Sequence, residues 1–315
     1  MTTKVWVGGT GSFNDPAEWS PTGTPGPGDL AIIQTGTATA ERQQLDGFEL
    51  QLQSPASVLD VTDVAFGAHF TLSVPPGPGG GATLNAIGFN ANHGLIEAVS
   101  PAGPQQFAPP FTINVIEASD WPGAPAIFYN DGTILVQSGQ PFAIQSQSSH
   151  AMLINNGMMH LDAPFMQADI GVPVWGSGTI ETGHPITPAA SALLLASIPS
   201  LEFGGAVGSG ETLMINGVAH IYLDKPAHFD ALIHDFQPNP SSSYLASFYQ
   251  PEIVLRNAPV TFYDVSNDIL SLWNGNTLVA QLRFADFAYT KDNFLVSTTG
   301  TTTTIEPQGT LHLLG

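Results

Sequence analysis

A short segment from His228 to Asp235 carries the residues with the clearest potential for chemistry. It places imidazoles beside carboxylates at His228, Asp230, His234 and Asp235. In an extended strand alternate side chains share a face, so His228 and Asp230 would lie together and His234 would continue their row. Imidazole nitrogens and carboxylate oxygens bind metals, so these four residues are candidate metal ligands. The competing interpretation, polar strand residues facing water, is favoured because zinc sites usually show tighter spacing.

Carboxylates in the central part of the chain are the other candidates for chemistry. A glycoside hydrolase needs two carboxylates that flank the scissile bond. Asp162, Asp169 and Glu181 lie in this part, and Glu97 and Glu181 each follow a glycine by three residues, a position predicted to face solvent. The chain has no Ser-His-Asp signature, P-loop or dinucleotide fingerprint. We therefore assign no catalytic or cofactor-binding residue, and a non-enzymatic role is favoured over an enzyme.

Four aromatic residues in loop-like segments offer a second kind of contact, stacking on sugar rings. They are Trp121, Tyr244, Phe248 and Tyr249. The alternative is that these rings cover the sides of the fold. A polysaccharide is thus a candidate partner.

The charge of the chain excludes several partners. It has six Lys and Arg residues against 26 Asp and Glu residues, a net charge of −20, and no cation between Gln43 and Asp224. A nucleic-acid binder needs clustered cations, so nucleic acid is excluded as a partner. A lyase acting on an anionic polysaccharide is disfavoured for the same reason. An acidic surface favours weak Ca²⁺ binding, so Ca²⁺ is a candidate cofactor.

Cysteine is absent, so the fold must be stabilised by core burial and not by disulfides. No apolar stretch approaches the length of a transmembrane helix. No apolar segment typical of a signal peptide follows Lys4, so we expect export, if it occurs, to use no cleaved N-terminal signal.

Five segments of the chain share a degenerate repeat: apolar residues, a short polar step, a glycine, and then alternating apolar positions. The glycines are Gly94, Gly132, Gly157, Gly178 and Gly217, at spacings of 38, 25, 21 and 39. A period near 20 with some doubled intervals is typical of a parallel β-helix with loops inserted at fixed corners. The sequence therefore predicts an all-β fold, a right-handed parallel β-helix. The alternative is a β-sandwich in which the Asn-x-Gly segments mark hairpin turns.

The repeat assigns roles to individual residues. Ile96, Ile134, Met159 and Ile180 each follow a glycine by two residues and are predicted to point inward and stack on one another. Asn92, Asn130 and Asn155 are predicted to form a hydrogen-bonded ladder at one corner. A left-handed backbone is predicted at this corner, since Asn and Gly tolerate it.

Three regions follow from the pattern: an N-terminal cap over residues 1–45, a solenoid over 46–224 and a C-terminal β unit over 225–315. The only stretch with helical character is residues 188–197. In the C-terminal unit, Trp273-Asn-Gly-Asn between alternating apolar residues predicts a hairpin.

Two segments resemble parts of bacterial surface and type I-secreted β-helix proteins of the adhesin and haemagglutinin kind. One runs from Val5-Trp-Val-Gly-Gly-Thr-Gly through Trp19 to Pro25-Gly-Pro-Gly-Asp, and in such proteins its aromatics cap the open end of the helix. The other begins at Phe229-Asp-Ala-Leu-Ile-His-Asp-Phe and resembles their C-terminal secretion unit. The chain has Asn239-Pro-Ser-Ser and Thr299-Gly-Thr-Thr where these units carry Gly-Asp and Asp-Gly-x-Gly-Gly-Thr. The resemblance therefore carries over no Ca²⁺ ligands.

These observations favour a secreted structural or adhesive protein of the bacterial surface or biofilm matrix. Open ends of a β-helix expose strand edges, so self-assembly into a homo-oligomer or fibre is expected unless the ends are covered. The alternative function is a carbohydrate-binding or polysaccharide-hydrolysing β-helix protein.

Overall fold

The computed structural model of the chain describes residues 1–41, 44–45, 48–53, 57–62, 65–66, 69–73, 82–99, 111–119, 123–136, 141–161, 166–183, 198–238 and 250–309. These residues form strands and three 3-10 turns, and none of them forms an α-helix. The predicted helix at 188–197 lies outside the described residues. The chain divides into two compact units, residues 1–160 and 161–315, and the division falls inside the predicted solenoid segment 46–224.

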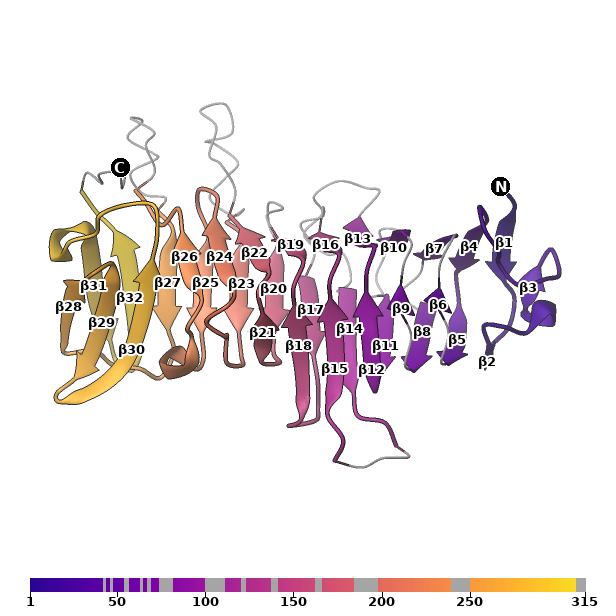
Figure 1. Cartoon of the computed structure of the whole chain (residues 1–315), viewed down its shortest axis with the longest axis horizontal. Helices are drawn as coiled ribbons and strands as arrows, with labels where there is room; N and C mark the ends of the chain where they lie inside the picture. The colour runs from indigo at the N-terminus through magenta and orange to yellow at the C-terminus, as the bar shows by residue number, and fades with distance from the viewer. Residues whose placement is uncertain are drawn as a thin grey trace. The chain divides into compact units, whose positions relative to one another are not determined.

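The first unit consists of three β-sheets, A, B and C, which are parallel except for one edge strand (Figure 1). Sheet A contains, in spatial order, β3 (Trp19–Ser20), β1 (Thr3–Trp6), β4 (Leu30–Ile33), β7 (Glu49–Leu52), β10 (His69–Ser73), β13 (Leu95–Val99), β16 (Thr133–Val136) and β19 (Met158–Leu161). Sheet B contains β2 (Thr10–Ser12), β5 (Gly36–Glu41), β8 (Ser57–Thr62), β11 (Thr83–Ile87), β14 (Phe111–Ile116) and β17 (Pro141–Gln145). Sheet C contains β6 (Gln44–Leu45), β9 (Ala65–Phe66), β12 (Phe89–Asn92), β15 (Ala126–Asn130) and β18 (Ala151–Asn155).

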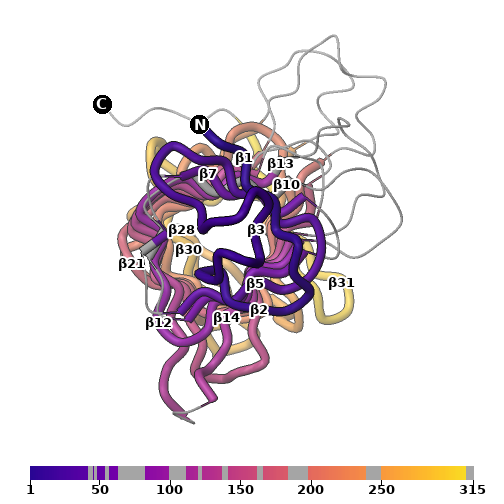
Figure 2. Tube along the Cα trace, turned by 90° about the vertical axis from the view of Figure 1, so that its right-hand side faces the viewer, coloured from indigo at the N-terminus to yellow at the C-terminus, as the bar shows by residue number. Residues whose placement is uncertain are grey.

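Successive strands from β4 to β19 join sheets A, B and C in rotation, and each pairs with the strand three places further along the chain. The trace of this unit circles repeatedly around a common interior (Figure 2). The strands that flank the Asn-x-Gly segments, such as β12 and β13, lie in different sheets. Hence these segments do not form the hairpins of the β-sandwich alternative.

Alternation of apolar and polar residues determines which side of each strand faces the interior. On sheet B, Leu59, Leu84, Ile113 and Ile144 pair in register and are fully buried. On sheet A, the predicted inward row of Ile96, Ile134 and Met159 is confirmed, with all three side chains fully buried and in register. Burial of each such side chain contributes about 1.5–3 kcal/mol, the main source of stability in a chain without disulfides.

The predicted asparagine ladder is confirmed where the chain leaves sheet C for sheet A. Asn92 Nδ2 donates to Asn130 Oδ1 at 2.8 Å, and Asn130 Nδ2 donates to Asn155 Oδ1 at 2.8 Å. All three side chains are fully buried. Because each amide both donates and accepts, the ladder satisfies polar groups that burial would otherwise penalise.

The backbone at this corner differs from the prediction. None of the ladder asparagines, nor Gly132 and Gly157, has a positive φ. Glycine is required for another reason: a Cβ on Gly132 would lie 2.1 Å from the Gly94 carbonyl oxygen, and one on Gly157 would lie 1.9 Å from the Gly132 oxygen. Close stacking of one turn on the next selects glycine here, and not a left-handed conformation.

An aromatic cluster lies at the N-terminal end of the first unit. Trp6, Phe13 and Trp19 are almost fully buried. The Trp19 ring lies 5.3 Å from Trp6 and 5.0 Å from Phe13, both edge-to-face, and Trp19 Nε1 donates to the Phe13 carbonyl at 2.8 Å. β3 pairs antiparallel with β1, which ends the parallel order of sheet A. A 3-10 turn at Pro16–Glu18 leads into β3.

The second unit also begins with parallel strands. Its part of sheet A contains β22 (Thr179–Thr182), β24 (Thr212–Ile215), β26 (Leu232–His234), β30 (Thr277–Phe284), β29 (Ile269–Asn274) and β28 (Phe262–Ser266). Its part of sheet B contains β20 (Gln167–Ile170), β23 (Ser200–Phe203), β25 (His220–Leu223), β27 (Glu252–Leu255), β32 (Thr302–Pro307) and β31 (Phe294–Thr299). On the third side of this unit, the described residues form one short strand, β21 (Val174–Gly176). Two isolated parallel β-bridges continue this side, one between Val174 and Val207 and one between Val207 and Phe229. Ile180 is buried in register with Leu213, as predicted.

Parallel pairing continues beyond residue 224, through β26 and β27, and then gives way to antiparallel hairpins. The predicted hairpin is confirmed: β29 and β30 pair antiparallel around Gly275, with Asn274 opposite Thr277. The end of the unit encloses a second aromatic cluster of Phe236, Phe284, Tyr289 and Phe294. The Tyr289 hydroxyl donates to the Phe236 carbonyl at 2.9 Å, and burial raises the pKa of this hydroxyl.

Candidate ligand-binding surface

The four predicted metal ligands do not share one strand face. Residues Pro226–His228 form a 3-10 turn, the strand begins only at Leu232, and the side chains of His228 and Asp230 are exposed. His234 Nδ1 lies 2.9 Å from Asp286 Oδ2, a contact with the segment after β30. Among the described residues no group of three or more His, Asp or Glu side chains could hold a metal ion.

Asp235 instead forms part of a carboxylate pair. Its backbone N–H donates to Asp286 Oδ2 at 3.3 Å, and both residues have a positive φ. Burial, and next the charge of Asp286, raise the pKa of the Asp235 carboxyl, while His234 opposes the shift. The folded state therefore holds its proton more tightly than the unfolded chain does, and stability falls as the pH rises from the ordinary Asp value of about 3.9 through the raised value.

We expect Asp235→Asn to raise the free energy of unfolding at pH 7 by up to about 1 kcal/mol, since the variant carries no charge to desolvate or repel. Asparagine also tolerates the left-handed backbone of Asp235, at φ 57°. The advantage should vanish below about pH 3, where the wild-type carboxyl is protonated in both states. Denaturant unfolding at the two pH values measures this, with the exposed Asp230→Asn as control. An advantage that persists unchanged at low pH would contradict the electrostatic cause.

The carboxylates of the central part of the chain that were considered as candidates lie in different surroundings, and Asp169 lies near the ion pair of Arg256 and Glu202. Arg256 Nη2 donates to Glu202 Oε2 at 2.9 Å, and its guanidinium lies 4.7 Å from the centre of the Tyr222 ring. Burial, followed by the charge of Glu202, raises the pKa of the neighbouring Asp169. Glu181 accepts a hydrogen bond from the Asn216 amide. Glu97 points outward as predicted, and Asp162 lies outside the described residues.

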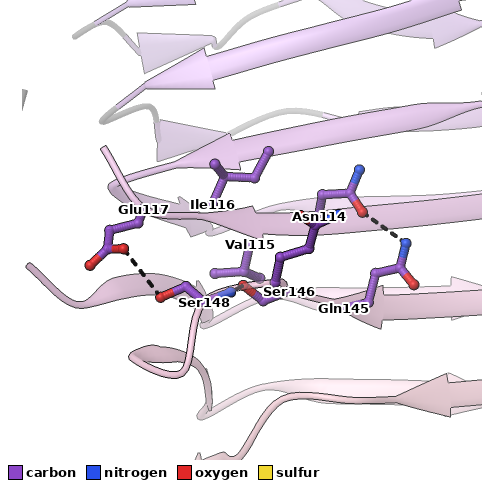
Figure 3. A pocket seen from close by; sticks show the side chains of 8 residues that line it. Asn114, Val115, Ile116, Glu117, Gln145, Ser146 and Ser148 are labelled. Carbon is purple, nitrogen blue, oxygen red and sulfur yellow. Dashed lines mark hydrogen bonds between the residues drawn. The ribbon is translucent and has the colours of Figure 1, made fainter. Parts of the chain in front are cut away.

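A surface hollow of about 570 Å³ lies in the first unit, where the chain leaves sheet B for sheet C (Figure 3). The ends of β14 and β17 and the residues that follow them form it. Its lining combines amides, hydroxyls, one carboxylate and two apolar side chains: Asn114, Val115, Ile116, Glu117, Gln145, Ser146, Gln147 and Ser148. Glu117 is the only charged group in this lining.

Glu117 is held at one side of the hollow. Its Oε2 accepts a hydrogen bond from Ser148 Oγ at 3.5 Å (Figure 3). Its Oε1 is buried from solvent, accepts no hydrogen bond from the described residues, and lies 3.6 Å from Nδ1 of the exposed His150. The hollow therefore contains one charged acceptor, which Ser148 holds on one side and His150 flanks on the other.

A row of outward-facing polar side chains crosses sheet B and ends in this hollow. Asn85 Nδ2 donates to Asp60 Oδ1 at 2.7 Å, and Asn114 Nδ2 donates to Asn85 Oδ1 at 2.7 Å. Gln145 Nε2 then donates to Asn114 Oδ1 at 3.0 Å. We call these four residues, on β8, β11, β14 and β17, the amide row.

Our sequence interpretation missed both the amide row and the hollow. A signal was present in two related pentapeptides, Thr83-Leu-Asn-Ala-Ile and Thr112-Ile-Asn-Val-Ile, which place Asn85 and Asn114 at the same position. These strands pair in full register. The predicted aromatic contacts Trp121, Tyr244, Phe248 and Tyr249 lie outside the described residues.

Comparison of the chain with known families and with curated proteins gives no match. No helix among the described residues is long and apolar enough to cross a membrane.

Proposed function

We propose that the protein is an extracellular adhesive or structural protein of the bacterial surface or biofilm matrix, built from right-handed parallel β-helices. The rotation of successive strands through three sheets supports a β-helix, since each strand pairs with the strand one turn later. The confirmed asparagine ladder supports the same assignment.

The observation that carries the adhesive role is the row of hydrogen-bonded polar side chains on the outer face of sheet B in the first unit. A β-helix presents such a face as a regular array because equivalent side chains repeat at the strand spacing of about 4.8 Å. Surfaces that recognise large neutral polymers need fixed donors and acceptors over an extended area, and the amide row provides them.

Binding is favoured over hydrolysis by the content of the hollow. A glycoside hydrolase places two carboxyl groups about 5–9.5 Å apart around the bond that it cleaves. The lining of the hollow contains Glu117 and no second carboxylate. This composition supports recognition of a ligand without chemistry on it.

The two aromatic clusters bear on self-assembly. The Trp6–Phe13–Trp19 cluster is buried at the start of the first unit, and the Phe284–Tyr289–Phe294 cluster is buried near the end of the second. A buried aromatic cluster at the N-terminal end of the first unit opposes stacking of copies through that end. Association through the lateral faces is therefore the form of self-assembly that we propose.

An array of polysaccharides and surface glycoproteins, probed with the purified protein, tests the adhesive role. We expect binding to at least one immobilised glycan without release of sugar fragments, in calcium and in chelator alike. Sedimentation and electron microscopy on the same samples measure the assembly state. Released fragments would assign hydrolysis instead, and no binding together with no assembly would overturn the proposal.

A further inference from the structure

We propose that the amide row and the hollow at its end form one binding site for a neutral polysaccharide chain. This inference rests on the proposed adhesive function and names the ligand class and the face that binds it. The row consists of Asp60, Asn85, Asn114 and Gln145, and the hollow adds Ile116, Glu117 and Ser148.

The amide row is arranged for hydroxyl recognition before any ligand arrives. The amide nitrogen of Asn114 donates one N–H to Asn85, and its oxygen accepts one hydrogen bond from Gln145. A side-chain amide has two N–H groups and two lone pairs, so a second donor and a second acceptor remain at Asn114 for an outside partner. Its side chain is half-buried. A sugar hydroxyl both donates and accepts, and therefore matches this pairing.

Hydrogen bonds within the row also fix the side chains. A free surface amide loses rotamer freedom when it binds a ligand, at a cost of about 0.5–1.5 kcal/mol for each side chain. In the row this ordering accompanies folding, because Asn85 and Asn114 are already bonded to neighbours on both sides. The regular spacing of parallel strands then repeats the same pair of groups along the face.

The hollow provides the contacts that a row of amides lacks. Ile116 is 36% exposed and offers an apolar surface to the C–H face of a sugar ring. The Glu117 carboxylate is the one charged acceptor in the lining, and hydrogen bonds to a charged acceptor are the stronger kind. Ser148 holds one oxygen of this carboxylate in place.

Charge selects a neutral ligand over an anionic one. The sequence has no Lys or Arg between Gln43 and Asp224, so no cation from this part of the chain can pair with uronate, sulfate or phosphate groups. Asp60 and Glu117 would repel such groups.

Isothermal titration with soluble polysaccharides tests the site on the full-length protein. The neutral probes are a mixed-linkage β-glucan, a xyloglucan and a galactomannan, and polygalacturonate is the anionic probe. We expect binding of at least one neutral probe and none of polygalacturonate. Asn114→Ala and Glu117→Ala should each weaken this binding about tenfold, since each removes about one strong ligand hydrogen bond.

Gln51→Ala is the matched control. Gln51 also belongs to an outward amide pair, because it accepts a hydrogen bond from Gln53, but it lies on sheet A. We expect this variant to bind as the wild type does, and circular dichroism confirms that all three variants are folded. Equal affinity in all three variants would overturn the inference and leave the adhesive function standing. Binding of glycoproteins in the array, with none of the neutral polysaccharides, would overturn the ligand class alone.

Discussion

Replacing Asn130 with alanine should lower the free energy of unfolding by about 2–4 kcal/mol. The substitution removes the middle rung of the buried ladder. Asn155 Oδ1 then loses a donor, and Asn92 Nδ2 loses one acceptor but keeps the Thr133 carbonyl at 3.1 Å, while both side chains stay buried. Each buried polar group left without its partner costs about 1–3 kcal/mol. Denaturant unfolding followed by circular dichroism measures the loss.

The control for this prediction is Asn156→Ala. Asn156 adjoins the ladder residue Asn155 but is exposed, and its amide donates to Asp131 at 2.8 Å on the surface. Removal of an exposed hydrogen bond should cost less than about 1 kcal/mol. If the two alanine variants lose similar stability, the ladder is not a special source of stability, and the corner is held by the glycine stacking alone.

Trp19→Ala should be the most damaging substitution in the N-terminal cluster, with a loss of about 3–5 kcal/mol. Trp19 is 1% exposed, its ring contacts Trp6 and Phe13, and its indole N–H satisfies the Phe13 carbonyl. The smaller side chain leaves a cavity at the end of the first unit. Thermal unfolding measures the loss of stability.

The same variant tests whether the cluster prevents end-to-end association. With the ring removed, apolar interior becomes accessible at the end of the unit, so we expect Trp19→Ala to sediment as larger species than the wild type. Trp175→Ala, which removes a ring that is 44% exposed in the second unit, is the control and should change neither property greatly. A destabilised Trp19→Ala protein that sediments like the wild type would show that the cluster stabilises the unit without blocking association.

Local chemistry explains why part of the fold was predictable from the sequence. Inward positions such as Ile96 and Ile134 follow from a repeat aligned on one glycine, because equivalent residues of successive turns must stack. The hairpin at Gly275 follows from an Asn-Gly turn between apolar strands. These features depend on neighbours in the sequence or on a regular period.

The candidate site was less predictable. The amide row joins residues that are 25, 29 and 31 positions apart, and the unequal loops between them conceal their common register. The metal prediction depended on an extended backbone at His228, where Pro226 begins a 3-10 turn instead. His234 pairs with Asp286, 52 residues away, which no local spacing indicates.

The sequence by itself determined the all-β class, the inward rows and the asparagine ladder. Equivalent residues of successive turns stack on one another, so the same pattern of residues recurs along the sequence. It also predicts that nucleic acid is not a partner, since phosphate binding requires clustered cations and the sequence has only six Lys and Arg residues. Only the tertiary structure decided which outward residues meet. Parallel pairing brought Asp60, Asn85, Asn114 and Gln145 into one row and placed Glu117 at its end, because register between distant strands is set by burial of the opposite face.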